Sequence, residues 1–221
     1  MDIVAGIRVG LAALAEPQRA AGQQAYMKSA MPFLGVRVPE ARRLAREIAK
    51  GETDAAALRS AATTLWDEAA YREERYAAMA LLAVRPASDD LSVAPLIEHM
   101  VRTGQWWDYT DELAHRLAGL HDRHPRDTAV LVRAWSVDDD MWMRRIAILS
   151  QLGRRDRVDP RLLSDVIEPN VADPEFFIRK AIGWALREYA RVAPERVRAF
   201  AEAHALSPLS RREALKHLDA R

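Results

Sequence analysis

The sequence predicts an all-α protein. Ala, Leu, Arg and Glu dominate its 221 residues, and these side chains lose the least conformational entropy in a helix. The 9 Gly and 11 Pro are few for a protein of strands and turns. Proline, which suits the first turn of a helix, precedes an amphipathic stretch at Pro17, Pro39, Pro125, Pro160, Pro174, Pro194 and Pro208. We expect about a dozen helices joined by short loops.

Several of these stretches resemble one another, namely residues 71–78, 142–148 and 177–182. Within them Arg75, Arg145 and Lys180 lie 70 and 35 residues apart, and the intervening register at position 110 falls inside another expected helix, Trp107 to Leu120. A period near 35 residues is typical of stacked helix pairs that curve into a concave surface. The sequence therefore predicts an α-solenoid forming a single domain over residues 1–221.

Composition excludes several classes of protein and site. With no Cys, the chain has no disulfide, thiolate metal site or cysteine nucleophile. Its longest apolar run, Ala77 to Val84, is too short to span a membrane, and Arg8 interrupts the apolar N-terminus, so we expect a soluble, cytoplasmic protein. No glycine-rich nucleotide-binding motif, serine-hydrolase motif or zinc-protease motif occurs, which argues against a nucleotide cofactor. His121 and His124 precede Pro125 at an expected helix end, where capping is favoured over metal binding.

The charge is unevenly distributed along the chain. Residues 1–50 carry 8 basic and 4 acidic side chains, residues 51–140 carry 9 and 17, and residues 142–221 carry 16 and 11. Two basic ends could hold an anionic polymer, although most charges on helical proteins solvate an outer face. Of the 33 basic residues 29 are Arg, which binds phosphate in a bidentate fork, but a GC-rich genome produces the same bias.

The segment Trp106-Trp107-Asp108-Tyr109-Thr110-Asp111 is the most distinctive in the sequence. If a helix begins near Trp107, then Trp107 and Asp111 share one face, and an aromatic wall stands beside a carboxylate. A purely structural interpretation makes the Trp pair core and lets Asp108 or Asp111 stabilise the helix N-terminus. We accept that interpretation for Trp106 and Asp108. Spacing alone leaves Trp107 and Asp111 undecided.

Arg145, Lys180 and Trp184, in the later repeats, each have an ordinary structural interpretation. Arg145 and Lys180 begin helices at equivalent places, so they could form a row of positive charges spaced to contact DNA phosphates. Alternatively, each could pair with an acid of the same helix or of a neighbouring repeat. Trp184 lies on a repeat helix, where Trp ordinarily packs, as we expect for Trp66, Trp135 and Trp142. Gly183 beside it weakens the helix and indicates that something approaches the backbone closely there.

At these residues the sequence resembles the DNA alkylation repair glycosylases of the AlkD type, which are built from HEAT-like repeats. No single short motif is decisive, but their order and spacing over nearly the whole chain are specific. The matching segments are 25–28, 33–35, 39–40, 65–67, 106–108 with Asp111, 142 with 145–149, 175–190 and 209–214. The resemblance implies a right-handed solenoid of HEAT-like repeats with a concave DNA-binding cleft.

The resemblance also implies an activity, hydrolysis of the N-glycosidic bond of cationic alkylated purines such as 3-methyladenine and 7-methylguanine in duplex DNA, within base excision repair. By matching motif, the catalytic aspartate falls on Asp111, the two cleft tryptophans fall on Trp107 and Trp184, the DNA-contacting arginine falls on Arg145, and a cleft tyrosine falls on Tyr26. Lys180 joins the expected DNA-binding residues. We expect a monomer without metal or other cofactor.

Physical chemistry agrees with this implied reaction. An alkylated purine with a positive charge is a good leaving group, and its departure leaves the sugar with oxocarbenium character that an ionised carboxylate stabilises. Indole faces favour a cation by roughly 0.5–2 kcal/mol per contact.

Two other interpretations of the function remain open. One is a non-catalytic helical-repeat scaffold that binds DNA or protein, and the other is general nucleic-acid binding by the basic ends.

Overall fold

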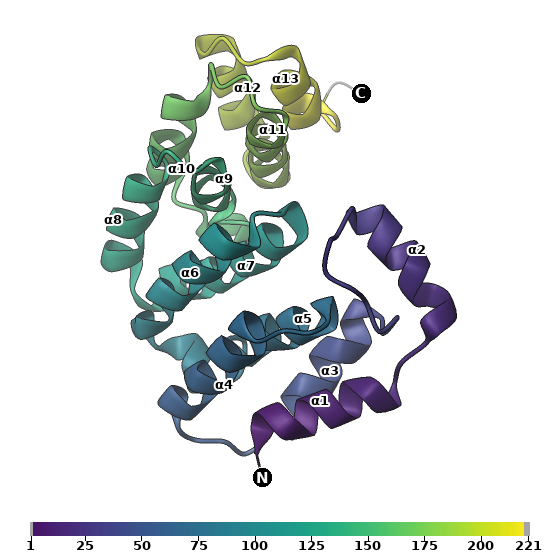
Figure 1. Cartoon of the computed structure of the whole chain (residues 1–221). Helices are drawn as coiled ribbons and strands as arrows, with labels where there is room; N and C mark the ends of the chain where they lie inside the picture. Colours follow the sequence, from purple (N-terminus) through teal and green to yellow (C-terminus); the bar gives the residue numbers. More distant parts are fainter. Residues whose placement is uncertain (1, 219–221) are drawn as a thin grey trace. The chain divides into compact units, whose positions relative to one another are not determined.

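The structure is a computed structural model that describes residues 2–218, and every regular element in that range is helical. The α-helices, shown in Figure 1, are α1 (Ile3–Ala13), α2 (Pro17–Met27), α3 (Val38–Ile48), α4 (Ala55–Asp67), α5 (Arg72–Leu81), α6 (Ala94–Gly104), α7 (Trp107–Arg123), α8 (Pro125–Trp135), α9 (Met141–Leu149), α10 (Pro160–Ile167), α11 (Phe176–Ala190), α12 (Pro194–Ala203) and α13 (Pro208–Leu215). Four short 3₁₀ helices join them, at η1 (Ala87–Asp89), η2 (Leu91–Val93), η3 (Arg155–Arg157) and η4 (Glu168–Asn170). The predicted all-α class is confirmed.

Proline begins most of the helices for which the sequence predicted it. It occupies the first or second position of α2, α3, α8, α10, α12 and α13, where the missing N–H removes no intrahelical hydrogen bond. Pro174 is different because it lies two residues before α11, and Glu175 is the N-cap. Helices α1, α4 and α9 begin instead with an aspartate N-cap, as when Asp140 accepts a hydrogen bond from Trp142 N at 2.8 Å.

The chain packs as two compact units, which divide between Leu96 and Ile97 in the first turn of α6. The first unit holds α1 to α5, and the second holds the rest of α6 and α7 to α13. The two short helices η1 and η2 come shortly before this division in the chain. The expectation of one domain over residues 1–221 stays a prediction.

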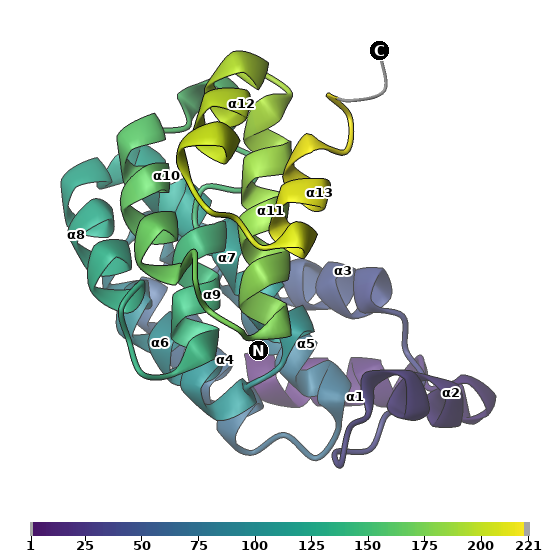
Figure 2. The ribbon, with the colours of Figure 1, turned by 90° about the horizontal axis from the view of Figure 1, so that it is seen from above.

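The predicted repeat period is visible in where helices begin. Helices α5, α7, α9 and α11 begin at Arg72, Trp107, Met141 and Phe176, which are 35, 34 and 35 residues apart. In the second unit α7, α9, α11 and α13 pack in this order as one layer, and α8, α10 and α12 lie against it (Figure 2). The helical-repeat fold is therefore confirmed, and equivalent positions on α7, α9 and α11 lie near one another.

Apolar side chains fill the space between the layers. Trp66, Trp135 and Trp142, which the sequence predicted as packing residues, are each at most 5% exposed. In the described residues no helix combines the length and apolar character needed to cross a membrane.

The first unit contains a buried carboxylate that shapes the loop before α3. Glu73, fully buried on α5, accepts hydrogen bonds from the backbone N–H groups of Leu34, Gly35 and Val36 at 2.9–3.1 Å. Gly35 has φ +89°, and a Cβ atom there would lie 2.0 Å from the Glu16 carbonyl oxygen. The motif Phe33-Leu34-Gly35 is thus explained by folding of this loop, since only glycine fits it.

Candidate catalytic and DNA-binding site

The predicted catalytic carboxylate and the predicted DNA-contacting arginine form a bidentate ion pair. Arg145 donates from Nε to Asp111 Oδ1 at 2.8 Å and from Nη2 to Asp111 Oδ2 at 2.9 Å. Its Nη1 donates to the carbonyl oxygen of Phe177 at 2.5 Å, and its guanidinium carbon lies 5.7 Å from the centre of the Phe177 ring. Since these residues belong to α7, α9 and α11, Arg145 connects three successive repeats.

This ion pair is largely removed from water. The side chain of Asp111 is 16% exposed and that of Arg145 is 6% exposed. Burial raises the pKa of Asp111 above the ordinary value for an aspartate, because the charged form loses hydration. The hydrogen bonds and charge of Arg145 oppose this shift in the pKa, while the nearby charge of Asp108 adds to it. The fork of Arg145 also fixes the plane of the carboxylate, which leaves part of its acceptor capacity unused.

Trp107 begins α7 and is half-buried, one helical turn before Asp111. Trp107 and Asp111 therefore lie on the same face of α7, as their four-residue spacing predicted. Trp106 has a different place. It packs with Trp142 and Phe177 at ring-centre distances of 6.3 and 6.2 Å. The structural interpretation of Trp106 is confirmed, and this aromatic cluster lies beside the ion pair because Phe177 belongs to both.

Trp184 lies on α11, two turns after Phe177, and is half-buried. Gly183 precedes it, and a Cβ atom at Gly183 would meet Glu213 Cβ at 2.5 Å and the Ser210 carbonyl oxygen at 3.0 Å. The expected close approach to the backbone at Gly183 is thus real, and the approaching element is α13. Lys180 of α11 pairs with Glu213 of α13, with Nζ and Oε1 3.2 Å apart.

The site residues predicted from sequence are therefore placed as follows. Asp111 and Arg145 touch, Trp107 lies one turn from Asp111, and Lys180 and Trp184 lie one turn apart on α11. In the structure Arg145 and Lys180 each form an ion pair with an acid of a neighbouring repeat, which is one of the two interpretations that the sequence left open. Arg145 keeps two N–H groups beyond these three hydrogen bonds. Its role at a phosphate, and that of Lys180, stays a prediction.

Tyr26 belongs to the first unit, where it lies in the last turn of α2. The residue is 76% exposed, which is unusual for a tyrosine in a folded unit. Its contact with DNA also stays a prediction.

Sequence reasoning missed how many arginines connect neighbouring repeats. Besides Arg145, ion pairs join residues about one repeat apart at Arg59–Asp90, Arg102–Asp138, Arg133–Asp165, Arg144–Asp173 and Arg154–Asp122. The excess of Arg therefore has a structural use besides those considered from the sequence. Opposite charges recurring at a spacing near 35 residues were the signal that could have revealed this.

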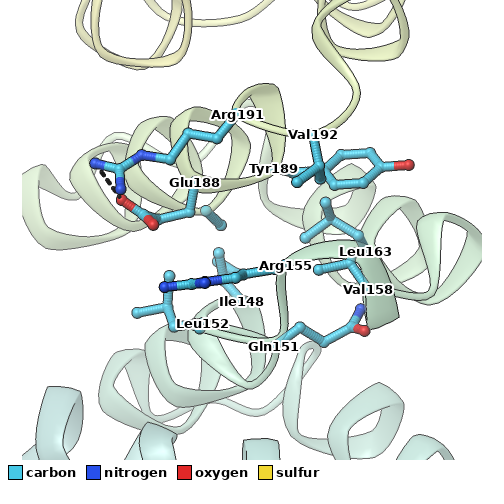
Figure 3. Close-up of a pocket in the computed structure, with 12 residues that line it drawn as sticks. Ile148, Gln151, Leu152, Arg155, Val158, Leu163, Glu188, Tyr189, Arg191 and Val192 are labelled. Atoms are coloured by element: carbon cyan, nitrogen blue, oxygen red, sulfur yellow. Dashed lines mark ion pairs between the residues drawn. The ribbon is translucent and has the colours of Figure 1, made fainter.

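A cavity of about 400 Å³ lies elsewhere in the second unit (Figure 3). Ile148, Leu152 and Leu163 line its apolar side, and Arg191 pairs with Glu188 on its wall. It is formed around the last turns of α9 and α11, whereas Arg145 lies in the middle of α9 and Phe177 in the first turn of α11. The cavity therefore contains none of the predicted site residues.

The sequence from residue 7 to residue 218 matches the family model described as DNA alkylation repair enzyme. Because this match covers nearly the whole chain, the protein belongs to that family, and the resemblance found in the sequence is confirmed. The family description implies DNA as the substrate. No curated protein sequence matches the chain.

Two solved structures are similar to the chain. The chain is similar to a predicted DNA alkylation repair enzyme from Enterococcus faecalis, with 27% identity and a TM-score of 0.85, over 94% of this chain and 98% of that one. It is also similar to AlkD2 from Streptococcus mutans, with 17% identity and a TM-score of 0.67, over 90% and 99% of the two chains. At 17% identity the second similarity shows the fold alone.

Proposed function

We propose that the protein is a DNA glycosylase that hydrolyses the N-glycosidic bond of cationic alkylated purines, such as 3-methyladenine and 7-methylguanine, in duplex DNA. This would be the first step of base excision repair. The observation that carries the proposal is the buried Asp111 carboxylate, oriented by Arg145 on a helix that begins with Trp107. Trp107, half-buried one helical turn before Asp111, supplies an aromatic surface beside this carboxylate.

The chemistry follows from charge. The bond between C1′ of the sugar and the purine nitrogen breaks with both electrons passing to the base, which neutralises its positive charge. Positive charge then develops on the sugar, where the ionised Asp111 would stabilise it. A water oxygen forms the new bond to C1′ and loses its proton to solvent or to the carboxylate. Because the base already carries its charge, no strong acid is required.

The surroundings of Asp111 support this role. Its low exposure strengthens a charge interaction relative to water, and its fixed orientation means that little reorganisation is needed during the reaction. The indole faces of Trp107 and Trp184 would favour a cationic base or sugar. Selectivity would then rest on the charge of the lesion, without hydrogen-bond readout of a flipped base.

The proposal is tested by release of 7-methylguanine from methylated duplex DNA. We expect Asp111→Asn to lower the rate of release by about 100-fold or more, as loss of a preorganised electrostatic group does elsewhere. A matched control is Asp165→Asn, which also removes the acid of an ion pair between repeats but lies on α10. The control should release base at the wild-type rate.

The other interpretations make different predictions in the same assay. Equal release by the wild type and Asp111→Asn would reject the catalytic role. No release by either protein, with binding that ignores methylation, would favour the scaffold or general DNA binding. In that last case affinity should fall steeply with salt.

A further inference from the structure

Two cations on α11 share a single counter-ion. Glu213, on α13, contacts Lys180 through Oε1 at 3.2 Å and Arg187 through Oε2. The Cβ atom of Glu213 lies over Gly183, because the missing side chain there lets α13 approach the α11 backbone. Glu213 therefore holds both cations on the side of α11 that faces α13.

The helix geometry places these cations next to Trp184. At 100° per residue, Arg187, Lys180 and Trp184 lie about 40°, 60° and 100° round α11 from Gly183. Phe177, which contacts α9 through Arg145, lies about 20° beyond Trp184. The two cations and Trp184 thus occupy the arc between the α13 contact and the α9 contact.

Lys180 is the most accessible of the three charged side chains. The side chains of Lys180 and Arg187 are 39% and 21% exposed, and that of Glu213 is 16% exposed. Burial alone would raise the pKa of Glu213, but Lys180 and Arg187 together lower it below the ordinary value for a glutamate. Glu213 therefore remains ionised near neutral pH, and one negative charge faces two positive ones.

We propose that Glu213 is an internal counter-ion that sets the affinity of the protein for DNA, by occupying donors of Lys180 and Arg187 that a backbone phosphate would otherwise bind. A phosphodiester offers these donors the same kind of anionic oxygens as the carboxylate. Glu213 is thus a positioning residue, since its two carboxylate oxygens hold the two cationic side chains. This inference rests on the DNA binding in the proposed function, but not on base release.

The test compares the binding of undamaged duplex DNA by the wild type and Glu213→Gln over a range of salt concentrations. The variant keeps the shape of the side chain and removes its charge. We expect binding about 3- to 10-fold tighter at low salt, and a plot of log K against log salt steeper by about 1–2, because one or two more phosphates become neutralised. A role confined to holding α13 in place would lower the melting temperature without making the slope steeper.

Two controls decide the outcome. Glu202→Gln removes the same charge from an exposed position on α12, so equal tightening by both variants would reduce the effect to net charge and overturn the proposal. Combining Glu213→Gln with Lys180→Gln and Arg187→Gln should abolish the gain. An unchanged slope in Glu213→Gln would also overturn the proposal.

The outcome can be separated from that of the proposed function. If the protein releases alkylated bases but Glu213→Gln binds DNA like the wild type, only this inference fails. If Glu213→Gln shows the steeper slope but no base is ever released, the inference holds and the glycosylase proposal fails.

Discussion

Asp111 and Arg145 are each other's principal partner, since both carboxylate oxygens accept from one guanidinium at 2.8 and 2.9 Å. The pair connects α7 to α9, and the third bond of Arg145 extends it to Phe177 on α11. Removing either member therefore affects both the charge near the proposed reaction and the packing of three repeats. Experiments on this site must separate these two effects.

Replacing Arg145 by Met should strongly destabilise the protein. It would leave the Asp111 carboxylate buried without its partner, which typically costs about 3–5 kcal/mol. Adding Asp111→Asn to Arg145→Met should recover part of this loss, because no buried charge remains. Urea denaturation measures both values. The control is Arg133→Met, which breaks a more exposed pair with Asp165 and should cost about 0–1 kcal/mol. Equal losses in Arg145→Met and Arg133→Met would contradict the prediction.

The rate of base release should fall in mildly acidic solution. Burial raises the pKa of Asp111, so protonation begins at a higher pH than for an ordinary aspartate. Only the ionised form stabilises the sugar cation, so the rate is full above this raised pKa and declines as the pH falls through it. Single-turnover release, corrected for spontaneous depurination, gives the profile. The residual activity of Asp111→Asn should lack this acid limb. An acid limb that persisted unchanged in Asp111→Asn would assign it to another group.

His121 should make the folded protein sensitive to acid. Its ring is buried and lies 3.4 Å from Ser150 Oγ. Burial first, and the charge of Arg154 second, lower its pKa from 6.5 to about 4. Between these pH values the unfolded chain binds a proton that the folded protein does not. Stability is therefore highest above pH 6.5 and falls by up to about 3 kcal/mol as the pH decreases to about 4.

The variant His121→Gln tests this prediction by keeping a polar side chain near Ser150 without the titration. Its free energy of unfolding should change less between pH 7.5 and 4.5 than that of the wild type. The control His124→Gln, at the C-cap of α7, should retain the acid sensitivity, because His121 is still present. If His121→Gln lost as much stability in acid as the wild type, another group would be responsible.

Two glycine-to-alanine substitutions should have opposite effects. Gly183→Ala would place a methyl group 2.5 Å from Glu213 Cβ and 3.0 Å from the Ser210 carbonyl oxygen. We expect a loss of about 1–3 kcal/mol, because overpacking outweighs the gain in helix propensity. Gly119→Ala on α7 meets only Arg123 Nη1 at 3.8 Å, so it should gain up to about 1 kcal/mol. Melting temperatures measure both, and stabilisation by Gly183→Ala would refute the close packing of α11 and α13.

Much of the candidate site could be predicted from the sequence because the repeat places equivalent positions near one another. The period near 35 residues followed from stretches that resemble one another, the shared face of Trp107 and Asp111 followed from their four-residue spacing on a helix, and the resemblance to a family assigned roles to Asp111 and Arg145. The orientation of Arg145 could not be predicted. Whether a basic side chain meets a phosphate or a neighbouring acid depends on which helix lies beside it, and spacing left both open. The position of Glu213 over Gly183 likewise depends on how α13 packs.

The sequence alone determined the helices, their period and the class of fold, because the propensities, proline starts and apolar spacing that carry this information are local. Tertiary structure decided the pairing of charges. Asp111 and Arg145 are 34 residues apart and meet only because α7 and α9 are packed together, and the same holds for Lys180 and Glu213 on α11 and α13. Burial decides how much hydration such a charge loses, and the side chains become buried only when the helices have packed together.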